Sequence, residues 1–568
     1  MTNTAKEYDV IVVGSGAAGG MAGYVLAKAG ISTLMLEAGR NYDPTTETPM
    51  FNLAGNAPLH GASTPDKEAG YFDATVDGGF SVPGEPYTKA AGSEFKWWRA
   101  RMLGGRTNHW GRMSLRFGPY DFKGKSRDGL GIDWPIAYDD LASYYDKVEA
   151  LIGVFGDSEN IENSPDSPAG ILHRPPRLRA FENWTKRVME GKHNIPLVPA
   201  HMAILTQQHG DRPACLYATD CLRGCQIGAN FQSTTVLIPP ASATGKLTVK
   251  TDAHVYEVLV DKSGKAAGVR YIDRITGERH EVRARAVMLG ASTGETARIL
   301  LNSKSTAFPD GLANSSGQVG RNLIDTPSVA VRAQVPQLED LPAFNDEGVT
   351  LSQAYAPWWG YDQQRAGKLN FARGYHIEMW GGRRQPEMED ILEIAELTKS
   401  YGASLHAEMK RLYGSVVWLM GRGEMIPNAQ SYLDLDPEIK DRFGLPVPRF
   451  HWQWGQEEYN SCAHQRQTLG DIFTSMGATV LTDMSQPIEK AIRPGGSMVH
   501  EAGSARMCAD RREGVIGAHG QTWDVSNLYV IDASAFSSMP DKNPTLTILA
   551  LSWRAADHLA NMLRKGEA

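Results

Sequence analysis

Short apolar runs bounded by glycine open and close the chain. Residues 8–13 (YDVIVV) form a β-branched run that ends at Gly14, and residues 21–30 then have helical spacing before a second apolar run at 32–36. Near the other end, the apolar run in LYVIDASAF (528–536) is followed by a helical pattern from residue 545. This alternation predicts an α/β protein built on buried parallel strands.

The middle of the chain has two further patterns of polar and apolar residues. Polar and apolar residues alternate in 246–261 and 266–273, which predicts antiparallel strands, and residues 285–303 are typical of a strand running into a helix. Residues 326–490 contain several tryptophans and an amphipathic run at 386–400. The sequence therefore predicts one domain from residues 1–325 and 491–568, and a second, α+β domain from residues 326–490.

Length and composition limit the classes of protein. A chain of 568 residues exceeds the size at which one hydrophobic core stops growing. The composition, 42% hydrophobic and 22% charged residues, argues against a disordered chain. The net charge of −7 argues against nucleic-acid binding as the main function, and no apolar run is long enough to cross a bilayer. The N-terminal residues resemble no cleavable targeting signal, so we expect either a cytoplasmic protein or export with a signal-bearing partner.

The first apolar run leads into the pattern Gly14-Ser-Gly16-Ala-Ala-Gly19. In such a motif the first glycine permits a tight turn, the second lets the backbone approach a pyrophosphate, and the third lets the helix pack on the strand. Glu37 ends the second run, where a carboxylate accepts hydrogen bonds from ribose hydroxyls. The sequence predicts a dinucleotide-binding site at this turn, and this motif alone leaves FAD and NAD open.

Several segments in order resemble the glucose–methanol–choline (GMC) family of FAD oxidoreductases. They are VIVVGSGAAGG, LEAGR, GGRTNHW, VMLGASTGETARILLNS, GRNLID, HEAGSARM and NPTLTILAL, and they lie between residue 8 and about residue 560. Within the family the chain looks most similar to catalytic subunits of bacterial glucose, glucoside and gluconate dehydrogenases, and less so to pyranose oxidase. The resemblance implies a Rossmann-like FAD-binding domain and a substrate-binding domain built on an antiparallel sheet.

The resemblance also implies a catalytic pair, His500 and Asn543. A histidine can take the hydroxyl proton of an alcohol near neutral pH while the hydride leaves to flavin N5, and an asparagine amide can orient the substrate oxygen. Pro544 suits the first turn of the helix that follows, whose positive end would favour the reduced flavin. Asp532 matches the flavin-contacting aspartate of the family, and a strand-end cap is its alternative role.

A further flavin contact is implied for the GGRTNHW segment. Gly104 and Gly105 would let the backbone approach the cofactor, and His109 matches the histidine that lines the flavin. In pyranose oxidases the matching histidine is bonded covalently to the flavin, whereas in the glucose dehydrogenases it is not. The sequence leaves both forms of attachment open.

Three of the five cysteines lie close together in the chain. Cys215, Cys221 and Cys225 have the spacing C-x5-C-x3-C, and three thiolates without a nearby histidine favour an iron–sulfur cluster over zinc. The related glucose dehydrogenase subunits carry a three-iron (3Fe-4S) cluster in a segment of this shape, although Leu216 stands here where they have a further cysteine. Reduced thiols in an ordinary loop are the alternative.

Together these features predict an FAD-dependent dehydrogenase that oxidises a hydroxyl of a sugar or glycoside. Electrons would pass through the cluster to an external acceptor such as a cytochrome c, with a small accessory subunit as a further partner. The alternatives are a pyranose-oxidase-like enzyme that reduces oxygen to hydrogen peroxide, a flavin-bound electron-transfer module without turnover, and, from the N-terminal motif alone, an NAD dehydrogenase.

Overall fold

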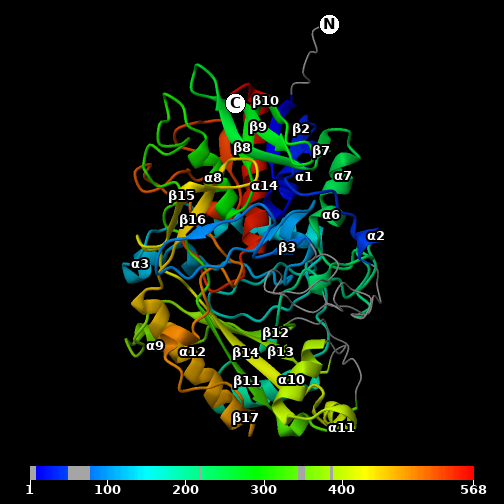
Figure 1. Ribbon diagram of the computed structural model, residues 1–568. Helices are drawn as coiled ribbons and strands as arrows, with labels where there is room; N and C mark the ends of the chain where they lie inside the picture. Colours follow the sequence, from blue (N-terminus) through cyan, green and yellow to red (C-terminus); the bar gives the residue numbers. More distant parts are fainter. Residues whose placement is uncertain (1–7, 49–76, 218–220, 343–351, 384–387, 568) are drawn as a thin grey trace.

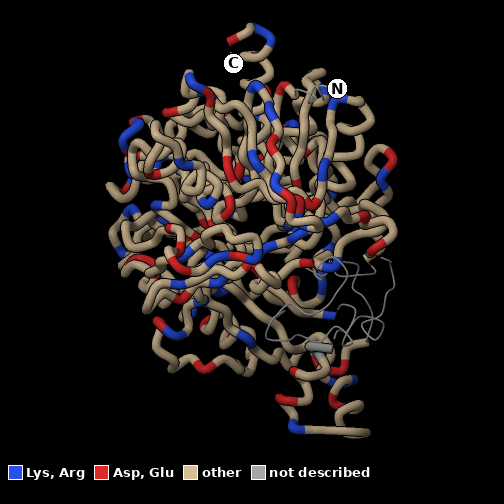
Figure 2. The backbone as a smooth tube through the Cα atoms, turned by 45° about the horizontal axis from the view of Figure 1, so that its top comes forward, with Lys and Arg blue, Asp and Glu red and all other residues tan. Residues whose placement is uncertain are grey.

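The computed structural model describes residues 8–48, 77–217, 221–342, 352–383 and 388–567. It contains two large sheets, with the first in the upper half and the second in the lower half of Figure 1. Lys and Arg are interspersed with Asp and Glu over the described chain (Figure 2). In these residues no helix is both apolar and long enough to cross a membrane.

The first sheet has a parallel core. Strands β7 (Leu247–Lys250), β2 (Thr33–Leu36), β1 (Tyr8–Val13) and β10 (Arg279–Leu289) follow one another in that order, and β18 (Leu528–Val530) also pairs with β10. Helices α1 (Ala17–Lys28) and α14 (Thr545–Lys565) pack together beside it, with the Ser552 hydroxyl donating to the Ala18 carbonyl at 2.6 Å. The predicted α/β class and its strand–helix–strand opening are confirmed.

One expected pairing is wrong. The stretch 246–261 is not one strand of an antiparallel pair, because it breaks into β7 and β8 (Ala253–Val260). Asp252, between them, has a φ of +54°, which a continuous strand does not allow. Strand β7 therefore runs parallel to β2, while β8 pairs in antiparallel fashion with β9 (Ala266–Asp273), which in turn pairs with the start of β10.

The second sheet is antiparallel throughout. Its order is β17 (Thr479–Val480), β11 (Ser328–Gln334), β14 (Val416–Gly423), β13 (Tyr375–Gly381), β12 (Ala354–Ala356) and β6 (Val198–Pro199). Helix α12 (Gln456–Ser475) packs on β11 and β14, and helix α5 (Ala180–Val188) contributes to the same hydrophobic core. Both β6 and α5 lie before residue 326, so the division at residues 325 and 490 stays a prediction.

Smaller elements join the two sheets. A third sheet contains β15 (Tyr432–Lys440), β16 (Pro446–His451) and β4 (Thr88–Lys89), and α4 (Asp139–Ile152) packs on α14. The remaining strands and α-helices are β3 (Gly78–Gly79), β5 (Arg99–Ala100), α2 (Pro44–Glu47), α3 (Gly124–Asp128), α6 (Ser233–Val236), α7 (Ile238–Ser242), α8 (Thr293–Asn302), α9 (Tyr361–Arg365), α10 (Met388–Thr398), α11 (Gly402–Leu412) and α13 (Ile488–Ala491). Helix α8 follows β10, as the sequence predicts.

Candidate active site

One cavity of about 650 Å³ is lined by residues from both large sheets. Its lining includes the Gly14–Gly16 turn and Glu37 from the first sheet, and residues of β13 and β14 from the second. His500 and Asn543 belong to the same lining. The cavity therefore connects the predicted nucleotide-binding turn with the predicted catalytic pair.

The turn after β1 depends on its glycines. Gly14 has a φ of +92°, and a Cβ there would lie 2.4 Å from the backbone oxygen of Gly290. A Cβ at Gly19 would lie 2.0 Å from the Gly14 backbone oxygen, so α1 packs this closely only without a side chain. At Gly16 the nearest protein atom to such a Cβ is 3.9 Å away, so the protein leaves open space beside the first turn of α1.

Glu37 ties this turn to neighbouring segments. Its carboxylate accepts hydrogen bonds from the backbone nitrogen of Ser15 at 3.0 Å, from the Ser15 hydroxyl at 2.5 Å and from the backbone nitrogen of Gly39 at 2.7 Å. The Ser15 hydroxyl in turn accepts from the backbone nitrogen of Gly104 at 2.8 Å. Burial raises the pKa of Glu37, and the hydrogen bonds oppose this shift.

The 104–109 segment borders the cavity through Gly105 and His109, whereas Gly104 contributes the hydrogen bond to Ser15. Both glycines have positive φ, at +86° for Gly104 and +52° for Gly105. The Nε2 atom of His109 accepts a hydrogen bond from the indole nitrogen of Trp98 at 2.9 Å. This donor fixes the ring orientation and places the proton of a neutral imidazole on Nδ1.

His500 is held by Asp325 and Thr326, which lie shortly before β11. The Thr326 hydroxyl lies 3.0 Å from its Nδ1, and Asp325 accepts hydrogen bonds from the backbone nitrogens of His500 at 3.2 Å and Gly496 at 2.7 Å. Burial first, and the charge of Arg422 second, hold the pKa of His500 well below its ordinary value. The imidazole is therefore neutral near pH 7. In the tautomer whose Nδ1–H donates to the Thr326 hydroxyl, Nε2 is unprotonated and can accept a proton.

Asn543 lies directly before Pro544 and the first turn of α14, which begins at Thr545. Its Nδ2 donates to Oε1 of Glu378 at 3.2 Å. Its buried Oδ1 has no hydrogen-bond partner among the described residues. Because an unpartnered buried acceptor costs free energy, this atom fits a site completed by a ligand that donates a hydrogen bond.

Asp532 also borders the cavity, but its oxygens already have protein partners. One oxygen accepts from the backbone nitrogen of Ser534 at 2.9 Å, and the other from the backbone nitrogen of Ser292 at 3.0 Å and the Thr296 hydroxyl at 2.6 Å. Burial raises the pKa of this carboxyl. These contacts match the alternative role of a cap, because they hold the N-terminus of α8 and the turn after β18.

Comparisons with known proteins agree with this arrangement. Family models described as GMC oxidoreductase match residues 8–328 and residues 427–552, which together cover most of the chain. The chain belongs to the GMC oxidoreductase family. It is an FAD-binding oxidoreductase that acts on CH–OH donors, as the resemblance implies.

The relatives act on different alcohols. The chain is 29% identical to 2-methyl-1,2-propanediol dehydrogenase of Mycolicibacterium austroafricanum, over 99% of this chain and 96% of that protein. It is 27% identical to the fructose dehydrogenase large subunit of Gluconobacter japonicus, over the whole of both chains, and 27% identical to 6'''-hydroxyparomomycin C oxidase of Streptomyces lividus, over 99% and 93%. Dehydrogenases and oxidases thus both occur among similar GMC proteins.

Solved structures show the same fold. Formate oxidase of Aspergillus oryzae has a TM-score of 0.65 at 13% identity over 99% of this chain and all of the other, and pyridoxine 4-oxidase has a TM-score of 0.62 at 18% identity over 97% and 99%.

The cavity of the present chain fits an elongated dinucleotide and its substrate. The features that fit are the open space at Gly16, the N-terminus of α1 and the Oδ1 of Asn543, which has no partner among the described residues. Gly14, Gly16, Glu37, His109 and Pro544 line the cavity where they could hold FAD.

The wall that the second sheet contributes was not predicted from the sequence. Glu378 on β13 accepts from Nε2 of His376 at 3.0 Å and forms an ion pair with Arg422 on β14 at 3.0 Å. Although burial opposes ionisation, Arg422 and His376 lower the pKa of Glu378 to about 2. The sequence signal for Glu378 and Arg422 is a charged side chain within a mostly apolar strand. For Thr326, the signal is its position directly after the GRNLID segment.

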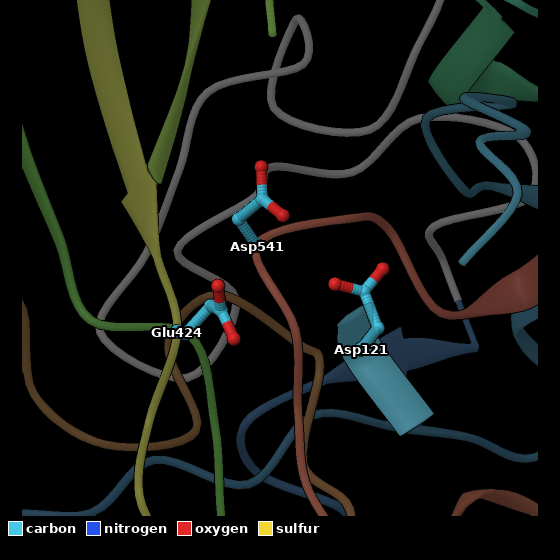
Figure 3. Close-up of side chains that lie close together, drawn as sticks. All are labelled: Asp121, Glu424 and Asp541. Carbon is cyan, nitrogen blue, oxygen red and sulfur yellow. The ribbon is translucent and has the colours of Figure 1, made fainter. Parts of the chain in front are cut away.

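Three acidic side chains meet around Lys542, the residue before Asn543. Figure 3 shows Asp121, Glu424 and Asp541 close together, and one carboxylate oxygen from each lies within 4.8 Å of the others. The buried Lys542 ammonium lies 2.8 Å from Asp541 and 3.1 Å from Asp121. This lysine supplies the cation that such a cluster needs, and burial raises the pKa of Glu424 to about 8.

The three clustered cysteines lie close to the cavity without lining it. Leu222, next to Cys221, is part of the lining, and the carbonyl of Cys221 accepts from Arg112 at 2.6 Å. Burial raises the pKa of Cys215 to about 11. Within the described residues, the three sulfurs do not lie within 4.8 Å of one another, so they form no ready site for a single ion such as zinc.

The pKa shift of His500 makes a testable prediction about pH. A base must be neutral to accept a proton, and a lowered pKa keeps the imidazole neutral to lower pH. We expect the rate constant of flavin reduction to stay constant as the pH falls from roughly 8 to about 6.5, the ordinary pKa of histidine, and to fall only below it. Anaerobic stopped-flow at saturating substrate measures this, and a loss of rate centred at or above about pH 6.5 would contradict the assignment.

Proposed function

We propose that this protein is an FAD-dependent dehydrogenase that oxidises a hydroxyl of a sugar or glycoside to a carbonyl. The observation that carries the proposal is the single cavity that joins the Gly14–Gly16 turn and Glu37 with His500 and Asn543. Bound FAD supplies the two-electron oxidant. The similarity to a fructose dehydrogenase large subunit supports a carbohydrate substrate.

The residues at the catalytic end have complementary roles in this proposal. His500 accepts the hydroxyl proton on Nε2, because Thr326 engages Nδ1 and the buried ring is neutral. On binding, the reacting hydroxyl donates its one proton to Asn543 Oδ1, which orients the oxygen, and the O–H then turns to His500 Nε2 for the proton transfer. Glu378 holds Nδ2 of the same amide. The N-terminus of α14 adds a partial positive charge beside Asn543.

The cysteine loop is the proposed route by which electrons leave. Cys215, Cys221 and Cys225 would each bind one iron of a 3Fe-4S cluster, and the loop is next to the cavity through Leu222. An external carrier such as a cytochrome c would then take single electrons, and a small accessory subunit would complete the enzyme. The similarity to a protein named as a large subunit supports a partner chain.

One comparison of acceptors separates the dehydrogenase from the oxidase alternative. We expect the purified protein, supplied with sugars or glycosides, to reduce ferricyanide or a quinone much faster than it consumes oxygen. Oxygen consumption at the same rate, with hydrogen peroxide formed in equal amounts, would favour the oxidase. Reduction of NAD by the same substrates would contradict an FAD enzyme.

Replacing a single clustered cysteine tests the electron route. We expect Cys225→Ser to lose the iron and sulfide of protein purified without air and to slow the reduction of a one-electron acceptor at least tenfold. Flavin reduction by substrate should stay within about twofold, because His500 and Asn543 are unchanged. Cys508→Ser, at a buried cysteine outside the cluster, is the control and should keep its iron. Equal iron contents in wild type and Cys225→Ser would contradict the cluster.

A further inference from the structure

Arg422 is a mostly buried cation with hydrogen-bonding capacity that the described residues leave unused. It lies on β14, lines the cavity, and its side chain is 11% exposed. A guanidinium has five N–H donors. One terminal nitrogen of Arg422 forms an ion pair with Oε2 of Glu378 at 3.0 Å. Its Nε is buried without a hydrogen-bond partner among the described residues.

The same carboxylate holds a second incomplete group. Oε1 of Glu378 accepts from Nδ2 of Asn543, whose Oδ1 lacks a partner in the described part of the chain. Glu378 thus places an unused donor, Arg422, beside an unused acceptor, Asn543, on one wall of the cavity. A ligand that satisfies both must present a hydroxyl that donates and a neighbouring oxygen that accepts.

The charges on this wall restrict the neighbouring oxygen. Glu378 is ionised, so an anionic group of a ligand would lie beside a buried carboxylate. A neutral hydroxyl avoids that repulsion, since it accepts from Arg422 and can donate to Glu378. The Arg422 guanidinium lies over the indole of Trp380, also in the lining, at 5.5 Å from the ring centre, so an aromatic side chain stands beside this donor.

We propose that Arg422 determines specificity by binding a neutral hydroxyl on the carbon next to the one oxidised. The substrates of this enzyme are then vicinal diols, whether in sugar rings or open polyols, and isolated alcohols or 2-hydroxy acids are poor substrates. This inference rests on the proposed function and adds the substrate feature that the second sheet recognises. If Arg422 only neutralised Glu378, the enzyme would not distinguish vicinal diols from alcohols that lack the neighbouring hydroxyl.

The test compares substrates that differ by one hydroxyl in wild type and Arg422→Met. The probes are methyl β-glucopyranoside with its monodeoxy analogues, and 1,2-propanediol with 1-propanol. In wild type we expect kcat/KM to fall about 100-fold when the hydroxyl next to the reacting one is absent. In Arg422→Met we expect kcat/KM for the parent diols to fall by a similar factor. Removing the neighbouring hydroxyl from the substrate should then lower the kcat/KM of this variant by less than about threefold.

Two further variants keep the test decisive. Arg422→Lys retains a cation opposite Glu378 but loses the planar fork of donors, so we expect it to fold, bind FAD and lose at least tenfold of the diol preference. Arg332→Met is the matched control. Arg332 on β11 also pairs with a glutamate, Glu393 at 2.7 Å, and its guanidinium lies 5.6 Å from the Trp418 ring centre. Unlike Arg422, it does not belong to the cavity lining. This control should keep the preference.

The outcomes separate the two proposals. If Arg422→Met lowers kcat/KM for diols and their deoxy partners by equal factors, or Arg422→Lys keeps the full preference, Arg422 does not read the vicinal hydroxyl and the inference is overturned while the proposed function stands. If wild type oxidises 1-propanol as well as 1,2-propanediol, the inference is again overturned. If no probe reduces the flavin of the wild type, both proposals fail.

Discussion

Replacing His500 by alanine should abolish turnover while the protein keeps its cofactor. We expect the rate constant of flavin reduction by substrate to fall about 10³-fold or more, because a positioned general base contributes roughly 10² to 10⁴. Anaerobic stopped-flow spectroscopy measures the flavin reduction directly. The FAD content should be unchanged.

His280→Ala is the control for this experiment. His280 lies on β10 with 39% of its side chain exposed and outside the cavity lining, so its loss should leave the rate within about twofold. A His500→Ala protein that binds FAD and is reduced as fast as wild type would show that another group takes the proton. Loss of FAD in this variant would instead make His500 a structural residue of the cofactor site.

Alanine at two glycines of the N-terminal turn should affect the stability of the protein without cofactor differently. Gly19→Ala places a Cβ 2.0 Å from the Gly14 backbone oxygen, so α1 must move and we expect the variant to lose several degrees or more of melting temperature as well as FAD. Gly16→Ala meets no protein atom within 3.9 Å, so its apoprotein should melt like wild type. It should nevertheless bind FAD at least 100-fold more weakly, because the methyl group enters the space where the pyrophosphate approaches.

Thermal unfolding of both apoproteins and FAD titrations measure this contrast. Gly30→Ala controls for a glycine whose neighbourhood is open, since a Cβ there would meet no heavy atom within 4 Å, although its φ of +82° adds local strain. If Gly16→Ala binds FAD as tightly as wild type, the open space at Gly16 does not receive the cofactor. If Gly19→Ala is as stable as wild type, the close contact of α1 with the turn does not restrict this position.

The parts of the fold that were predicted from the sequence are those encoded by local patterns. The run before Gly14, the helical spacing after it and the apolar run ending at Glu37 specify β1, α1 and β2, because each element is defined within a few residues. The helix after Pro544 was predicted for the same reason. The split at Asp252 was missed, because the apolar residues before it (Leu247, Val249) and after it (Ala253, Val255) keep the same alternating phase.

The catalytic wall depends instead on contacts between distant residues. Asn543 and Glu378 are 165 positions apart, and Glu378 meets Arg422 only because β13 pairs with β14 in a register that places Glu378 opposite Met420. Thr326 reaches His500 across 174 positions. No spacing in the sequence encodes these approaches, so the predicted pair His500 and Asn543 came from a family resemblance and their partners only from the structure.

The anaerobic visible spectrum of the purified protein, before and after addition of methyl glucosides and other vicinal diols, tests the central claim most directly. We predict flavin bands that bleach when a diol is added, above a broad absorption from the cluster that remains. Flavin bands that no carbohydrate or diol bleaches, in a protein whose FAD is still reduced by dithionite, would contradict an enzyme that oxidises CH–OH groups in the cavity of His500 and Asn543.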